Sequence, residues 1–193
     1  PDPKPDTDFP IIIPSTYTVS VVDGDNRYER KVSKLNNGIS LEPNGCEGKL
    51  FAGWYSDGIP FDLSKITSDV EVYAKYVSDD YLCTKYIEQG LFRVYGMTLI
   101  TAIDSTNYED AGFIINGEKI SCGFTENYGT FTARILFGSN VSRRAKIITH
   151  NLSLRNASNG DTFEVTPYWT TLDGTTVYGK LRTFTYNSRG IIG

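Results

Sequence analysis

A single histidine, His150, limits the nucleophilic chemistry that this chain of 193 residues could perform. Serine and cysteine hydrolases of the triad type need a histidine as general base. His150 lies in Thr149-His150-Asn151, inside an expected strand, and no nucleophile motif flanks it. A strand histidine with one solvated face is far more often structural. The sequence therefore predicts no catalytic residue set of this kind.

The cysteines do not form a metal-binding pattern. Cys46, Cys83 and Cys122 are scattered, and with one histidine they lack any paired ligand spacing for zinc. We predict no metal site and no cofactor. An odd number of cysteines also excludes a framework in which every cysteine is paired. Cys83 and Cys122 could be strand neighbours, although an isolated buried thiol is the commoner arrangement, and whether they pair stays open.

A short acidic turn resembles the start of a calcium loop only superficially. Asp23-Gly24-Asp25-Asn26 has its glycine in the wrong place, and Lys34 stands where a bidentate glutamate should close the cage. Because Asp, Asn and Gly are also the residues that turns prefer, we interpret this segment as a hairpin turn.

Paired carboxylates of the glycosidase type would have to come from distant parts of the chain. Glu109 and Asp110, Asp62 or Glu164 would need to converge in one cleft, and nothing in their spacing requires it. We expect such acids to project from flat strands into water.

Aromatic side chains are the remaining candidates for a binding role. Exposed Tyr55, Tyr168 and Tyr178 could stack on sugar rings or anchor a protein partner. The alternative is that these tyrosines cover sheet faces as cross-strand pairs, which is common in β proteins. Trp54 and Trp169 are expected in the core.

Composition excludes two classes of partner or location. The net charge of −4 provides no basic patch for nucleic acid. No apolar run has the length of a transmembrane helix, the longest aliphatic piece being Ile11-Ile12-Ile13. The chain begins at Pro1 rather than Met, which suggests an excised fragment.

The elements that must position these residues are nearly all strands. Residues 1–14 are proline-rich and are expected to be a linker. A hairpin follows, with strands at Tyr17–Val22 and Arg27–Val32, and Ile39 with Leu41 is expected to form a brief strand. Residues 48–76 then predict a strand, a turn, a short bridge and a second strand, with one face buried.

Residues 78–80 are short and polar, and we place a domain boundary there. Seven strand candidates follow, separated by Asn-Gly and Asp-Gly turns, and this pattern is typical of a β-sandwich. The candidates are 91–103, 112–115, 118–124, 130–137, 145–154, 163–171 and 177–186. In 163–169, Phe163, Val165, Pro167 and Trp169 alternate with Glu164, Thr166 and Tyr168.

Two resemblances support this organisation. The first is carried by a set of spaced residues: Gly48, Phe51, Gly53-Trp54-Tyr55, Phe61-Asp62, Thr67, Asp69 and Tyr73-Ala74. Their pattern resembles the Listeria-Bacteroides repeat, the B-repeat of internalin-type bacterial surface proteins, with Tyr76 in place of the final Trp. This resemblance covers residues 15–77 and implies a small β-grasp-like module without catalytic residues. Residues 104–112 and the run from Thr166 to Gly179 are similar to C-terminal segments of clostridial surface proteins.

The expected fold is therefore mainly β, with a small β-grasp-like B-repeat module at 15–77 followed by an immunoglobulin-like or fibronectin-III-like β-sandwich at 81–193. The expected function is that of a noncatalytic module of a bacterial cell-surface or secreted protein. It would bind a protein or glycan on a host or bacterial surface, or act as a spacer. The alternative is a carbohydrate-binding or glycan-degrading unit.

Overall fold

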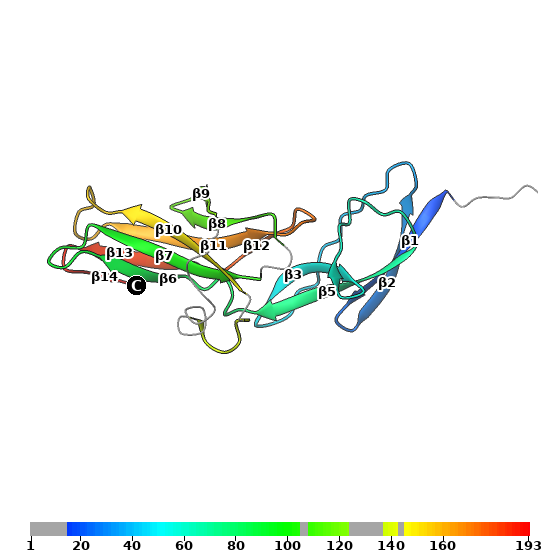
Figure 1. Cartoon of the computed structure of the whole chain (residues 1–193), viewed down its shortest axis with the longest axis horizontal. Helices are drawn as coiled ribbons and strands as arrows, with labels where there is room; N and C mark the ends of the chain where they lie inside the picture. Colours follow the sequence, from blue (N-terminus) through cyan, green and yellow to red (C-terminus); the bar gives the residue numbers. More distant parts are fainter. Residues whose placement is uncertain (1–14, 105–107, 124–136, 143–144) are drawn as a thin grey trace, which may run out of the picture.

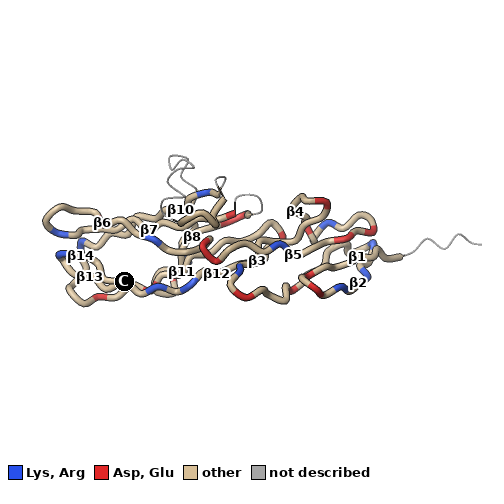
Figure 2. Tube along the Cα trace, turned by 90° about the horizontal axis from the view of Figure 1, so that it is seen from below, with Lys and Arg blue, Asp and Glu red and all other residues tan. Residues whose placement is uncertain are grey.

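The computed structural model describes residues 15–104, 108–123, 137–142 and 145–193, and in these ranges the chain is mainly β, as expected. The expected linker at 1–14 lies outside them. Figures 1 and 2 show an elongated molecule in which the sheet of the N-terminal part and the sheets of the C-terminal part lie end to end. In the described ranges, no helix has the length and apolar character needed to cross a membrane.

The N-terminal part is one sheet with the strand order β2-β1-β5-β3-β4. Its strands are β1 (Thr16–Asp23), β2 (Asn26–Ser33), β3 (Lys49–Ser56), β4 (Ile59–Pro60) and β5 (Val70–Ser78). The predicted β1–β2 hairpin is confirmed, while β1 pairs with β5 in parallel. Val19 and Val21 of β1 and Val72 of β5 are buried, which follows from the two-residue period of strands.

The brief strand predicted at Ile39 and Leu41 is wrong. This segment has no strand partner and instead packs as a loop, in which the Ile39 amide donates to the Leu63 carbonyl and the Ile66 amide to the Asn37 carbonyl. Leu41 is nevertheless buried, so the apolar residue predicted correctly that this segment packs in the core, but not that it pairs with a strand.

A β-bulge in β3 sets the orientation of the largest core side chain. The register with β5 shifts between Phe51 and Trp54, and Gly53 takes a φ of 107°, which glycine adopts without strain. As a result Ala52, Trp54 and Tyr55 are all buried instead of alternating. Trp54 is in the core, as predicted, and meets Phe51 edge to face at 5.5 Å between ring centroids.

Tyr76 completes the first core with a polar contact. Its hydroxyl donates to Asp23 Oδ1 (2.7 Å) and accepts from the Gly45 amide (3.1 Å), while Asp23 Oδ2 accepts from the Asn44 amide (2.6 Å). Burial and the hydrogen bond to Asp23 raise the pKa of Tyr76 to about 12. These bonds tie the loop before β3 to the end of β1.

This contact predicts a loss of stability at alkaline pH. A phenol in the unfolded chain titrates near 10, so the stabilisation from Tyr76 is fully present below about pH 10 and is lost as the pH rises toward 12. The expected slope is at most about 1.4 kcal/mol per pH unit for this proton. Urea unfolding of the wild type and of Tyr76→Phe at several pH values measures it. If the unfolding free energy fell equally steeply with pH in both proteins, the alkaline loss of stability would not come from Tyr76.

The C-terminal part contains two sheets, ordered β10-β7-β6 and β14-β13-β11-β8-β9, with β12 also paired to β11. The strands are β6 (Lys85–Gln89), β7 (Gly96–Ile103), β8 (Asp110–Ile115), β9 (Glu118–Ser121), β10 (Lys146–Ser153), β11 (Thr162–Thr170), β12 (Thr176–Tyr178), β13 (Arg182–Asn187) and β14 (Gly190–Ile192). Tyr86 of β6 meets Phe184 of β13 edge to face, so side chains of both sheets share a core.

Several predicted strand limits in this part are wrong. The candidate 91–103 begins only at Gly96, β6 and β14 were not predicted, and 130–137 lies almost wholly outside the described residues. The candidate 177–186 is two strands, β12 and β13, along the same edge of β11. Pro167 lies between the two paired stretches and has no amide hydrogen to donate, so the edge ladder is interrupted there.

Candidate functional site

The three candidate tyrosines lie in two places and differ in exposure. Tyr55 is in β3, where the N-terminal part meets the C-terminal part, whereas Tyr168 and Tyr178 are opposite each other on β11 and β12. Tyr55 is 3% exposed and Tyr168 is 0% exposed, so neither offers a free ring face to a sugar. Tyr178 is 54% exposed. The expectation of three exposed rings is therefore corrected for Tyr55 and Tyr168.

Cross-strand pairing explains the burial of Tyr55. Its ring packs beside that of Tyr73 on β5, with centroids 6.0 Å apart. Lys75 covers it, with Nζ 4.6 Å from the ring centroid, and also forms an ion pair with Asp104 Oδ2 at 3.0 Å. Burial alone would lower the pKa of Lys75, but the Asp104 carboxylate outweighs it and the net shift is upward. Because Asp104 follows β7, this pair links the two parts.

The residues predicted as a linker are also held in place. Ser78 still belongs to β5, and its hydroxyl donates to Asp80, which also accepts from Asn140 (2.7 Å). These two hydrogen bonds lower the pKa of Asp80. Asp79 pairs with Lys180 at 2.7 Å. The segment between the two parts is therefore bonded to the C-terminal part.

Tyr81 and Leu82, which follow this segment, pack into the core of the C-terminal part. The Tyr81 ring meets Trp169 edge to face at 6.2 Å, and its hydroxyl accepts from the Ser142 amide. Leu82 is fully buried, and its amide donates to the Ala102 carbonyl. We use the name junction for Tyr55, Lys75, Asp104 and residues 78–82.

Removing the ion pair at the junction tests its contribution. Asp104→Ala leaves Lys75 half-buried without this carboxylate, and we expect a loss of about 1 kcal/mol in the free energy of unfolding. Asp79→Ala is the matched control because Lys180 is solvent-exposed, and we expect no measurable change. Urea denaturation measures both, and equal effects would show that the Lys75–Asp104 pair is energetically an ordinary surface pair.

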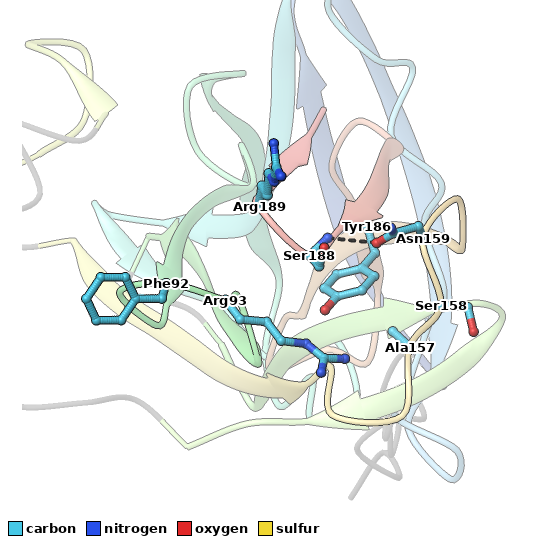
Figure 3. Close-up of a pocket in the computed structure, with 8 residues that line it drawn as sticks. All are labelled: Phe92, Arg93, Ala157, Ser158, Asn159, Tyr186, Ser188 and Arg189. Atoms are coloured by element: carbon cyan, nitrogen blue, oxygen red, sulfur yellow. Dashed lines mark hydrogen bonds between the residues drawn. The ribbon is translucent and has the colours of Figure 1, made fainter.

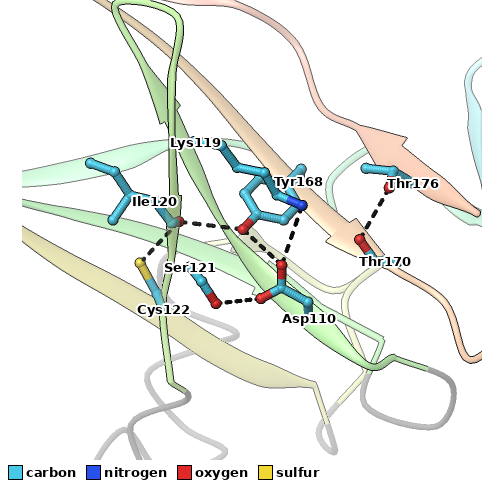
Figure 4. A network of polar contacts seen from close by, with 8 residues as sticks. All are labelled: Asp110, Lys119, Ile120, Ser121, Cys122, Tyr168, Thr170 and Thr176. Atoms are coloured by element: carbon cyan, nitrogen blue, oxygen red, sulfur yellow. Dashed lines mark hydrogen bonds and ion pairs between the residues drawn. The ribbon is translucent and has the colours of Figure 1, made fainter. Parts of the chain in front are cut away.

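Tyr168 lies within a polar network on the outer face of the second sheet (Figure 4). Its hydroxyl donates to Asp110 Oδ2 (3.0 Å), Ser121 donates to Asp110 Oδ1 (2.5 Å), and Lys119 lies 3.4 Å from the same carboxylate. Lys119 Nζ also lies 4.4 Å from the centroid of the Tyr168 ring and covers it. This network accounts for the burial of a ring that sequence alternation places on the wet face.

The charges in this network are mutually satisfied. Burial would raise the pKa of Asp110, but the hydrogen bonds from Ser121 and Tyr168 and the charge of Lys119 hold it below its usual range. Burial and the hydrogen bond to Asp110 raise the pKa of Tyr168. A carboxylate kept ionised by three donors is a poor general acid, so the arrangement suits a structural role.

Two of the other candidate acids, Glu164 and Asp62, lie in other parts of the structure from Asp110. Glu164 lies six residues from Thr170, the strand partner of Asp110, which places the two acids about 20 Å apart along β11. Asp62 is in the N-terminal part, where it bonds Ser64 and Lys65. Retaining and inverting glycosidases need about 5–10 Å between their carboxyl groups, so neither acid pairs with Asp110 in this way.

The remaining chemical candidates are also apart from one another. His150 is in β10 opposite Leu99, and Cys46, Cys83 and Cys122 are all free thiols. Burial raises the pKa of Cys122. Within the part of the chain that the structure describes, no group of three or more His, Cys, Asp or Glu side chains could hold a metal ion.

Sequence reasoning missed one exposed apolar group, at the end of the molecule farthest from β1 and β2. Leu91 and Phe92 lie in the turn between β6 and β7 and not in a strand. Beside them is an open hollow lined by Arg93, Ser158, Ser188 and other residues (Figure 3). Gly90 directly before Leu91 was the available signal of a turn. No protein-family model, curated protein or solved structure matches this chain.

Proposed function

We propose that this chain is a noncatalytic module of a bacterial cell-surface or secreted protein, which presents β surfaces to a partner or spaces neighbouring units outside the cell. The observation that carries the proposal is the end-to-end arrangement of two β units fixed at the junction (Figures 1 and 2). Lys75–Asp104 crosses from one part to the other, and Asp79–Lys180 holds the connecting segment against the C-terminal part. A bonded junction suits a spacer because it keeps the distance and orientation between the two ends of the molecule constant.

The N-terminal part is proposed to be a β-grasp-like B-repeat module at 15–77. Support comes from its strand order, in which the parallel pair β1 and β5 is central and antiparallel neighbours flank it. The aromatic residues that carry the resemblance also pack on one another, since Phe51 lies 5.5 Å from Trp54 and 5.9 Å from Tyr76. Tyr76 thus keeps the ring contact expected of the family's final Trp and adds a hydroxyl.

The C-terminal part is proposed to be an immunoglobulin-like or fibronectin-III-like sandwich at 81–193. Support comes from the division of its strands, since β6, β7 and β10 form one sheet while β8, β9, β11 and β13 lie together in the other. Sandwiches of this kind divide their strands in this order. The chain departs from antibody domains in that Cys83 and Cys122 are free thiols.

The alternative of a carbohydrate-binding or glycan-degrading unit has less support. Tyr55 and Tyr168 are covered by lysines, and Asp110 is held by its own network. Tyr178 is the candidate that retains an exposed ring. A protein or glycan on a host or bacterial surface remains the proposed class of partner.

A glycan panel scored for both binding and sugar release tests the proposal. We expect the wild-type chain to release no sugar. Any glycan that it binds should be recovered chemically unchanged. Release that is lost in Asp110→Asn or Glu164→Gln, with both variants folded by circular dichroism, would overturn the noncatalytic function. Glu164→Gln is a safe variant because Glu164 is exposed on its strand.

A further inference from the structure

Three loops form a single surface at the end of the C-terminal part. These loops are 90–95 between β6 and β7, 154–161 between β10 and β11, and 188–189 between β13 and β14. The Val94 amide donates to the Ser188 carbonyl (3.0 Å), and the Leu154 amide donates to the Tyr95 carbonyl (2.8 Å). We call this surface the distal tip. It lies at the end away from β1 and β2 (Figure 1).

The distal tip exposes two adjacent large apolar side chains. Leu91 is 96% exposed and Phe92 is 97% exposed, and Phe92 points away from the other residues drawn in Figure 3. Single exposed apolar residues are normal on protein surfaces, but an adjacent pair at a protruding turn is a feature of binding sites.

The turn that carries this pair is built tightly. The Tyr95 amide donates to the Gln89 carbonyl across its base (3.0 Å). Gly90 has a φ of 131°, and a Cβ at this position would lie 2.1 Å from the Arg93 carbonyl oxygen. The backbone therefore holds Leu91 and Phe92 outward, so their exposure follows from the geometry of the turn.

The loops of the distal tip carry more positive than negative charge. The three loops carry Arg93, Arg155 and Arg189 against one acid, Asp161, which accepts a hydrogen bond from the Ser158 amide within its own loop. The whole chain has a net charge of −4, so the distal tip differs in sign from the molecule. Basic positions at this end are visible near β6 and β14 in Figure 2.

We propose that the distal tip docks on an anionic lipid bilayer, with Leu91 and Phe92 inserted at the interface and the arginines against headgroup phosphates. Guanidinium groups bind phosphate through paired hydrogen bonds, and apolar side chains next to cationic ones are the combination that interfacial binding requires. Arg93 and Arg189 line the open hollow with Ser158 and Ser188, which leaves room for a headgroup beside the apolar pair. A projecting pair fits a deformable surface, whereas a protein would need a matching acid-rimmed pocket.

This inference rests on the proposed noncatalytic binding function and specifies the chemistry of the partner. Co-sedimentation with phosphatidylcholine vesicles, with and without roughly 30% phosphatidylglycerol, tests it. We expect binding to the anionic vesicles that weakens as salt is raised. The double variant Leu91→Ser/Phe92→Ser should bind at least about tenfold more weakly. Arg93→Gln/Arg155→Gln/Arg189→Gln should lose the preference for phosphatidylglycerol.

Leu35→Ser is the matched control, because Leu35 is 100% exposed in the N-terminal part, and its vesicle binding should equal that of the wild type. Absence of wild-type binding to anionic vesicles, or equal binding by the double variant at the tip, would overturn the proposal. Capture of a purified acidic protein through Leu91 and Phe92 without vesicle binding would also overturn it and assign the tip to a protein partner. None of these vesicle-binding results bears on whether the chain releases sugar. The glycan panel therefore tests the proposed noncatalytic function independently of this inference.

Discussion

Trp54→Ala is expected to lower the free energy of unfolding of the N-terminal part by about 3–5 kcal/mol, the usual loss when a large buried aromatic side chain is removed. Trp54 is 0% exposed and packs against Phe51, in a bulge that directs the indole into the core. Alanine would leave a cavity that the surrounding strands close only in part. Urea unfolding followed by circular dichroism measures the change.

Trp54→Phe is the informative control for this substitution. Among the described residues, Trp54 Nε1 is buried without a hydrogen-bond partner, so phenylalanine sacrifices no polar contact and loses only part of the packed area. We expect a loss of about 1–2 kcal/mol for this variant. A loss below about 1 kcal/mol for Trp54→Ala would mean that the side chain is exposed in solution, and a binding role for it would be reopened.

Gly112→Ala is expected to cost about 2–4 kcal/mol in the C-terminal part. A Cβ on Gly112 would lie 2.0 Å from the carbonyl oxygen of Ile120 and 3.2 Å from the Cys122 amide nitrogen. These are backbone atoms of the neighbouring chain segment, so β8 and β9 must separate to admit a methyl group. The displacement would also disturb the network of Asp110 and Ser121.

Gly123→Ala provides the comparison, since a Cβ there meets nothing within 4 Å. We expect this variant to unfold within about 0.5 kcal/mol of the wild type. Thermal unfolding and urea unfolding of both variants measure the difference. Equal stability of the two alanine variants would show that the Ile120 carbonyl does not lie this close to Gly112.

Local patterns predicted the parts of the fold that depend on neighbouring residues in the sequence. Alternating Val19 and Val21 with an Asp-Gly turn predicted the first hairpin, and alternation around Trp169 predicted β11. Features that depend on contacts between residues far apart in the sequence could not be predicted in this way. The division of 177–186 into two strands follows from Pro167 in a different strand, and a pattern within 177–186 does not contain that information.

The candidate site illustrates the same limit. The period of a strand placed Tyr168 on the face opposite Trp169, but its burial depends on Lys119 and Asp110, which come from two other strands. The assignment of 91–103 to one strand obscured the exposed turn at Leu91 and Phe92. The ion pair of Lys75 with Asp104 crosses a predicted domain boundary, so neither side of the boundary alone predicts it.

Residual dipolar couplings of the backbone amides test the claim of a stiff two-part body most directly. We predict that couplings from β1–β5 and from β6–β14 fit one common alignment tensor, because Lys75–Asp104 crosses the junction while Asp80–Asn140 and Tyr81–Trp169 attach residues 78–82 to the C-terminal part. Asp104→Ala should reduce this agreement. Two tensors of clearly different magnitude in the wild-type chain would mean that the parts reorient independently, and this result would contradict a fixed junction.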